Sequence, residues 1–196
     1  GTAASLPPGT DSNAYCLLGP QAQRLYHDLE TDFVAEFGDL ADAVDDLVAG
    51  RVIAPNAMVK ALRLAQIAGG FAVESTTGET FQIGTEKADL LAETIGDLPE
   101  TEPVVVFARF VEDLASIRRV ALAAGRGYLE VSGRANELQQ WQESAGNEVL
   151  GVQLQAGGVG VDLTRARYQI YYSLDFNLGN YQQTRKRIHR PGQTRP

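Results

Sequence analysis

Hydrophobic residues in the second half of this chain follow patterns that predict strands and helices in alternation. The β-branched run PVVVFARF (103–110) predicts a strand that is buried on both faces. Three more strands are predicted over 127–133, 148–154 and 168–175, with helices over 111–125, 135–146 and 178–190. Short strands that alternate with helices are typical of an α/β fold with a parallel sheet and right-handed crossovers.

The first half has a different pattern. AYCLLG (14–19) predicts a short strand in which Cys16 is a buried thiol, and Pro20 begins a helix. The other expected elements are a helix over 56–68, a hairpin around Thr77-Gly78 and a helix over 85–98. We therefore divide the chain into a linker (1–12), an opening strand with a helical extension (13–84), and an α/β core (85–196).

Aromatic residues on apolar helix faces are expected in the core. Phe33 and Phe37 continue the spacing of four residues that begins at Leu25, and Trp141 lies on the apolar side of its helix. His27 is expected at the helix surface.

The formal net charge of −8 hides a strong asymmetry. Residues 165–196 contain seven basic residues and one acid, a net charge of +6, so the other 164 residues carry −14. A basic end on an acidic chain predicts an anionic partner at one place, although a solvated basic tail has the same composition.

Other function classes are disfavoured by composition. No apolar run approaches the length of a membrane span, and the N-terminus has no signal-peptide pattern. One cysteine and two histidines provide neither an internal disulfide nor a usual zinc cluster. We expect a cytoplasmic protein without a metal site of its own.

The predicted last helix places three polar side chains on one face. Gln183, Arg187 and Arg190 are spaced i, i+4, i+7. Guanidinium groups match phosphate oxygens and stay charged at physiological pH. The segment 176–196 has no acid to pair with them, so an anion contact is favoured over a surface helix with internal ion pairs.

A glycine-rich turn, LQAGGVGVDLTRA (154–166), follows the strand at 148–154. Gly157, Gly158 and Gly160 let the backbone approach a ligand closely and expose N–H groups to an anion. The turn is no dinucleotide fingerprint, because Leu163 stands where the third glycine would be, which disfavours an oxidoreductase. A tight turn without a ligand remains an alternative.

Together these two stretches resemble motifs V and VI of superfamily 2 helicases, and most closely those of Swi/Snf-type DNA translocases. The matching residues are Gly157, Gly158, Gly160, Leu163, Thr164, Asp175, Gln183, Arg187, His189, Arg190, Gly192 and Gln193. VVVFARF resembles motif IV. The departures are Asp162 in place of a common Asn, Arg109 in place of a small polar residue or Gln, and Pro191 in place of an aliphatic residue.

The resemblance implies the second of two RecA-like lobes, the helicase C-terminal lobe. The sequence contains neither G-x-x-x-x-G-K-[ST] nor an Asp-Glu dipeptide, so ATP and Mg²⁺ would be bound mainly by the N-terminal lobe of the same polypeptide. The isolated chain should therefore not hydrolyse ATP, and we expect it to be monomeric.

Site residues follow from the same resemblance. Arg187 and Arg190 are the expected catalytic arginine fingers. The expected ATP contacts are Gly160, Asp162, Gln183 and Gln193, and the expected contacts to double-stranded DNA are Arg109, Ser132, Gly133, Ala156, Gly157 and Gly158. Asp162 could bind a ribose hydroxyl or cap a helix, and the sequence leaves both open.

The alternative function is a non-catalytic RecA-like nucleic-acid-binding module. The short spacing between motifs favours a bacterial or phage protein.

Overall fold

The computed structural model describes residues 10–37, 55–74, 76–156 and 162–174. These residues form two compact units: Tyr15–Leu90, and a second that contains the described residues from Leu91 onward together with those before Tyr15. The predicted helix over 178–190 and the glycines of the Gly-rich turn lie outside the described residues.

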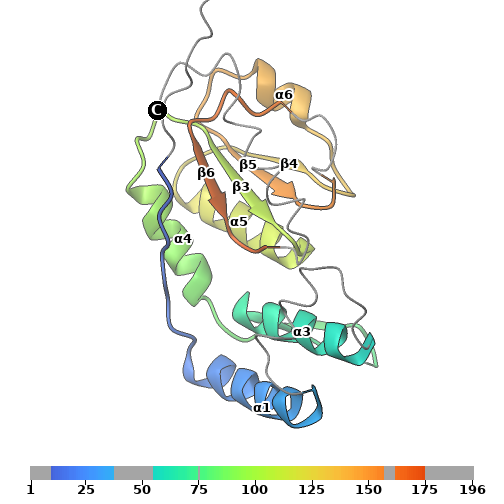
Figure 1. Ribbon diagram of the computed structural model, residues 1–196. Coiled ribbons are helices and arrows are strands. Elements are labelled where there is room, and N and C mark those ends of the chain that lie inside the picture. The colour runs from blue at the N-terminus through green and yellow to red at the C-terminus, as the bar shows by residue number, and fades with distance from the viewer. Residues whose placement is uncertain (1–9, 38–54, 75, 157–161, 175–196) are drawn as a thin grey trace, which may run out of the picture. The chain divides into compact units, whose positions relative to one another are not determined.

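The second unit contains a four-stranded parallel sheet, as the hydrophobic pattern predicted. Its strands are β3 (Val104–Ala108), β4 (Tyr128–Val131), β5 (Val149–Gln153) and β6 (Tyr168–Tyr171). They lie in the order β4-β5-β3-β6, which Figure 1 shows, with parallel pairing throughout. Every residue of β3 is buried, because this strand has a neighbour on each side and side chains packed on both faces.

Helices cover this sheet. Helix α5 (Val111–Ala123) packs against β3, β4 and β5, and α6 (Leu138–Glu143) packs against β4. Because side chains alternate between the faces of a strand, Leu129 and Val131 join the fully buried Trp141 in one core cluster, as expected for that tryptophan. Tyr128 and Glu130 belong to the other set, and the Tyr128 hydroxyl reaches the backbone carbonyl of Leu114 in α5 (3.4 Å).

The first unit is built around two helices and a hairpin. Helices α1 (Pro20–Phe37) and α3 (Pro55–Ala68) pack on each other, and β1 (Phe71–Val73) pairs with β2 (Thr80–Gln82) in antiparallel fashion. The predicted helices and hairpin are confirmed, although each strand of the hairpin has only three residues. Helix α4 (Glu86–Gly96) follows, as expected from its acidic first turn.

The predicted strand at 14–19 is wrong. Residues 10–19 have no regular secondary structure, and Tyr15 and Leu17 are 82% and 90% exposed. Cys16 is exposed as well, not a buried thiol. A strand needs a neighbour for its backbone groups, and no described strand pairs with this run. His27 lies at the surface as expected, whereas the side chains of Phe33 and Phe37 are outside the described set.

Candidate nucleic-acid interface at the carboxyl edge of the sheet

Parallel strands bring four of the predicted contact residues to one edge. Arg109 follows β3, Ser132 and Gly133 follow β4, and Ala156 lies three residues beyond β5. Because the strands run in one direction, all their carboxyl ends meet at this edge, where open α/β sheets bind ligands. Gly157, Gly158, Gly160, Gln183, Arg187, Arg190 and Gln193 lie outside the described residues.

Gln153, which the sequence did not single out, links two of these residues across the sheet. Its side-chain oxygen accepts a hydrogen bond from the backbone N–H of Gly133 (3.2 Å), and its amide nitrogen donates to the carbonyl of Arg109 (3.3 Å). Gln153 ends the strand between β3 and β4, so one side chain sets the spacing of both neighbouring loops. This bridging role of Gln153 can be recognised only once β5 is known to lie between β3 and β4.

A buried carboxylate orders the end of β3. Asp113, in the first turn of α5, is 1% exposed and accepts a hydrogen bond from the Ser173 hydroxyl. The Ser173 oxygen in turn accepts one from the backbone N–H of Arg109 (2.8 Å). The guanidinium of Arg109 lies over the ring of Phe110, 5.6 Å from its centroid. These contacts tie the ends of β3 and β6 to the start of α5.

A second carboxylate orders the loop after β4. Glu130 is 6% exposed and accepts hydrogen bonds from Arg134 Nε (2.8 Å), Arg134 Nη2 (3.1 Å), the Ser132 hydroxyl (2.6 Å) and the Tyr128 hydroxyl (3.0 Å). The Arg134 pair, aided by these hydroxyls, lowers the pKa of Glu130 against the opposing effect of burial. Burial and the neighbouring carboxylate raise the pKa of Tyr128, so its hydroxyl stays protonated and donates.

Gly151 makes room for this network. It lies directly opposite Glu130 in the parallel β4–β5 pair. A Cβ at Gly151 would collide with the Tyr128 hydroxyl, so a larger residue would displace the donor that bonds to Glu130.

Asp162, which follows the glycines of the Gly-rich turn, serves a local structural purpose. Its Oδ1 accepts hydrogen bonds from the backbone N–H (3.0 Å) and the hydroxyl (2.7 Å) of Thr164. The carboxylate therefore caps a turn. Of the two roles predicted for Asp162 this resembles the helix cap, but the described residues that follow form a turn and a strand and no helix. The side chain of Gln142 in α6 donates to the Asp162 carbonyl (3.0 Å) and holds the same segment.

Arg165 is one of the seven basic residues counted over 165–196, but its charge is paired inside the α/β unit. Its Nη2 lies 2.8 Å from Glu148 Oε2, and its guanidinium stacks over Trp141, 4.4 Å from the ring centroid. The two charged side chains are only 16% and 20% exposed. One of the seven C-terminal basic residues is thus neutralised inside the unit and does not contribute to a surface for an anion.

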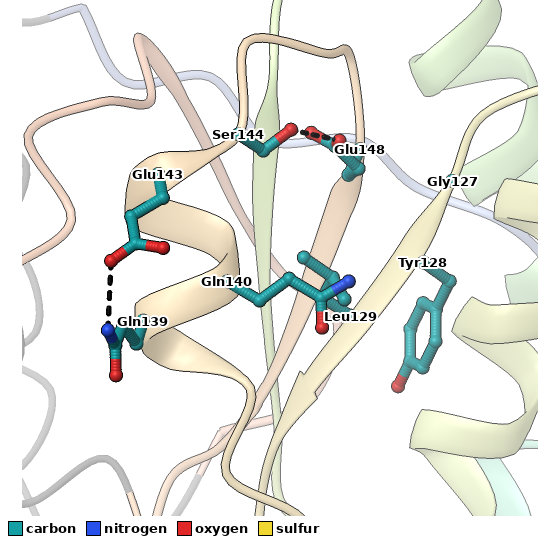
Figure 2. A pocket seen from close by; sticks show the side chains of 8 residues that line it. All are labelled: Gly127, Tyr128, Leu129, Gln139, Gln140, Glu143, Ser144 and Glu148. Atoms are coloured by element: carbon teal, nitrogen blue, oxygen red, sulfur yellow. Dashed lines mark hydrogen bonds between the residues drawn. The ribbon is translucent and has the colours of Figure 1, made fainter.

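A hollow of about 690 Å³ lies away from this edge, at the amino ends of β4 and β5. Figure 2 shows its lining, in which Gln139 contacts Glu143 and Ser144 donates to Glu148. None of the predicted site residues borders it. Among the described residues no group of acidic, histidine or cysteine side chains could hold a metal ion, and no helix is long and apolar enough to span a membrane.

Comparison with known proteins identifies the class. Residues 86–192 match the helicase conserved C-terminal domain family. Since the match covers more than half of the chain, the chain belongs to this family. The predicted resemblance to a helicase C-terminal lobe is confirmed, and the parallel sheet with flanking helices is the RecA-like fold of such a lobe.

Individual relatives agree with this class. DNA repair protein RAD5 of Cryptococcus neoformans var. neoformans is 28% identical over 131 residues, which is 62% of this chain and 11% of that protein. The Drosophila melanogaster homolog of SWI/SNF-related matrix-associated actin-dependent regulator of chromatin subfamily A containing DEAD/H box 1 is 31% identical over 103 residues, 50% of this chain and 12% of that protein. The chain therefore spans only about a tenth of these relatives.

A solved structure has the same fold. The C-terminal part of the Fun30 ATPase domain superposes with a TM-score of 0.51 at 24% identity, over 56% of this chain and 38% of that one. The relatives named here come from eukaryotes, so these comparisons do not support the predicted bacterial or phage source.

Proposed function

We propose that this chain is the second motor lobe of an ATP-dependent double-stranded DNA translocase or helicase. The observation that carries the proposal is the family match over 86–192, which includes both the Gly-rich turn and the arginine-rich segment, residues 178–192. Relatives described as a DNA repair protein and, in Mycosarcoma maydis, as a chromatin-remodeling ATPase support a role for ATP and DNA.

The chemistry is divided between two lobes. The N-terminal RecA-like lobe holds ATP and Mg²⁺, because this chain has no phosphate loop and no Asp-Glu pair of its own. Arg187 and Arg190 approach the γ-phosphate and offset the charge that develops during phosphoryl transfer. Such arginine fingers contribute about 10³–10⁵ in rate, or roughly 4–7 kcal/mol. The isolated chain is expected to be inactive.

The remaining nucleotide contacts are assigned to the Gly-rich turn, the predicted last helix and the residues just after that helix. Gly160, Gln183 and Gln193 are proposed from their motif positions alone. Asp162 fits less well, because its Oδ1 already accepts two hydrogen bonds from Thr164 and caps a turn. A ribose contact by Asp162 would have to use its other carboxylate oxygen.

The DNA backbone is proposed to run along the carboxyl edge of the sheet. Arg109 follows β3 there, and Ser132 and Gly133 follow β4, with Ala156 and the glycines beyond β5. Contacts to phosphates at this edge would support movement along DNA without sequence preference. Opening and closing of the two lobes would then be coupled to ATP binding and hydrolysis.

The test is the ATPase rate of the intact protein, with and without duplex DNA, for wild type and Arg190→Ala. Turnover stimulated by DNA should fall by about 10³–10⁵ in the variant while ATP still binds. Arg119→Ala removes an exposed arginine of α5 and serves as the matched control. Unchanged turnover in Arg190→Ala would rule out the arginine finger. Duplex binding without any ATPase in the wild type would favour the non-catalytic binding module.

A further inference from the structure

The two residues predicted to contact phosphate after β4 already use their donors within the chain. The Ser132 hydroxyl donates to Glu130, and its backbone N–H donates to the carbonyl of Ala135 (2.7 Å). The backbone N–H of Gly133 donates to Gln153 (3.2 Å). A phosphate at this loop would have to break one of these bonds, or meet a different residue.

Arg134 is that different residue. It directly follows Gly133, and its side chain is 51% exposed although it is paired with Glu130. The pair uses Nε and Nη2 of the guanidinium, so Nη1 lies outside it. A guanidinium carries five N–H donors in a planar fork, and a carboxylate on one side leaves donors on the other side for a second anion.

The position of Glu130 explains how the guanidinium is oriented. Glu130 belongs to the strand β4 itself, is 6% exposed, and receives hydroxyl hydrogen bonds from Tyr128 and Ser132 in addition to the arginine. A buried carboxylate costs free energy to desolvate, and an apolar residue of similar size is often at least as stabilising. A glutamate at position 130 is therefore better explained by its role in orienting the Arg134 guanidinium than by a contribution to stability.

We propose that Arg134 binds a phosphate of the DNA backbone at the carboxyl edge of the sheet and that Glu130 is a positioning residue for its guanidinium. This inference deepens the proposed function and rests on it. Ser132 and Gly133 then shape the loop, and Arg134 makes the contact. The ligand class is the phosphodiester of double-stranded DNA, bound without base recognition.

The first experiment measures binding of the intact protein to a short fluorescent duplex at increasing salt concentration. Each lost phosphate contact lowers the slope of log K against log salt by about 0.9, or about eightfold in affinity for a tenfold change in salt. Arg134→Gln is expected to show this loss. Arg119→Gln, which removes the same charge from an exposed position on α5, should keep the wild-type slope. Equal slopes for Arg134→Gln and wild type overturn the proposal.

The second experiment tests positioning. Glu130→Gln makes the protein more positive, so charge alone predicts tighter DNA binding, whereas loss of a positioning carboxylate predicts weaker binding. In the Arg134→Gln background, Glu130→Gln should have no further effect on binding. Tighter binding by Glu130→Gln, or an equal effect in both backgrounds, overturns its positioning role.

Arg134→Lys covers the case in which Glu130→Gln does not fold. Lysine keeps the charge but cannot form the two-nitrogen pair with the carboxylate, so binding should remain weak. Full rescue by lysine would show that charge alone is sufficient. If the wild-type protein does not bind duplex DNA, the proposed function is refuted. If the wild-type protein binds DNA in a salt-dependent way and Arg134→Gln has the same salt slope, only this inference is refuted.

Discussion

Replacing Arg165 with methionine should destabilise the α/β unit far more than replacing an exposed arginine. Arg165 Nη2 lies 2.8 Å from Glu148 Oε2 and also donates to the carbonyl of Gly146. The same guanidinium stacks 4.4 Å from the centroid of the fully buried Trp141 ring. Arg165→Met keeps an apolar stem over the ring but leaves the Glu148 carboxylate without this cation.

The expected cost follows from burial. Breaking a fully buried ion pair costs about 3–5 kcal/mol, whereas an exposed pair contributes about 0–1 kcal/mol. At 16% and 20% exposure the pair is closer to the buried limit, which suggests about 2–3 kcal/mol. Loss of the cation–π contact adds about 0.5–1 kcal/mol. A total near 3 kcal/mol corresponds to a fall in Tm of about 6–12 °C for a chain of this size.

Urea unfolding followed by tryptophan fluorescence measures this cost, because Trp141 is the only tryptophan in the chain and lies in the contact itself. Arg119→Met is the matched control and should change the free energy of unfolding by less than about 0.5 kcal/mol. A double-mutant cycle with Glu148→Gln isolates the coupling of the pair. If Arg165→Met behaves like Arg119→Met, or the coupling energy is zero, the pair does not stabilise the fold.

The same pair predicts a pH dependence. Burial alone would raise the pKa of Glu148, but hydrogen bonds from Ser144 and Arg165 outweigh it and hold the pKa below the ordinary value of 4.5. A depressed pKa in the folded state stabilises the protein at neutral pH, and this contribution is lost as the pH falls below about 4.5. In Glu148→Gln, urea midpoints should fall less steeply over this acid range than in wild type. Parallel profiles would contradict the assignment.

Two further substitutions, one in each unit, test how the units are packed. Leu150→Ala removes a fully buried side chain of β5 and should cost about 2–5 kcal/mol in urea unfolding, against less than about 0.5 kcal/mol for Leu122→Ala, which is 54% exposed; similar losses would mean that the sheet is not the core. Gly70→Ala should lower Tm, because the glycine has φ +88° and a Cβ would lie 2.5 Å from a backbone oxygen. Gly96→Ala, with no atom near its Cβ position, should instead stabilise by about 0.4–1 kcal/mol, and the same sign for both glycines would contradict this account.

The hydrophobic pattern predicted the regular elements well where they pack on one another. The parallel sheet, α5 and α6 were expected because each has a long apolar run or a clear apolar face. The residues of the run at 14–19 are equally apolar, yet Tyr15 and Leu17 are exposed. A strand becomes stable through a neighbour that takes its backbone hydrogen bonds, and six residues of sequence do not say whether that neighbour exists.

The candidate site shows the same division. The motifs led to Arg109, Ser132 and Gly133, and the structure places them after β3 and β4, the two strands that flank β5. Their hydrogen-bond partners could not be predicted, because Gln153 and Ser173 reach them through strand order and lie 20 to 64 residues away in the chain. In the sequence, nothing distinguishes Glu130 from any other charged residue within a predicted strand.

By itself the sequence determined the class of this protein, since the Gly-rich turn and the arginine-rich segment are local patterns whose chemistry depends on spacing along the chain. It also predicted most of the helices and strands that the structure describes, with the run at 14–19 as the exception, since apolar periodicity reflects burial. Only the tertiary structure decided which charges are available to a ligand. Arg165 is neutralised by a carboxylate 17 residues away and packed on a tryptophan, whereas Arg134 is held at the sheet edge with half of its side chain exposed. Charge is a property of the residue, but its availability depends on the partners that folding brings within a few ångströms.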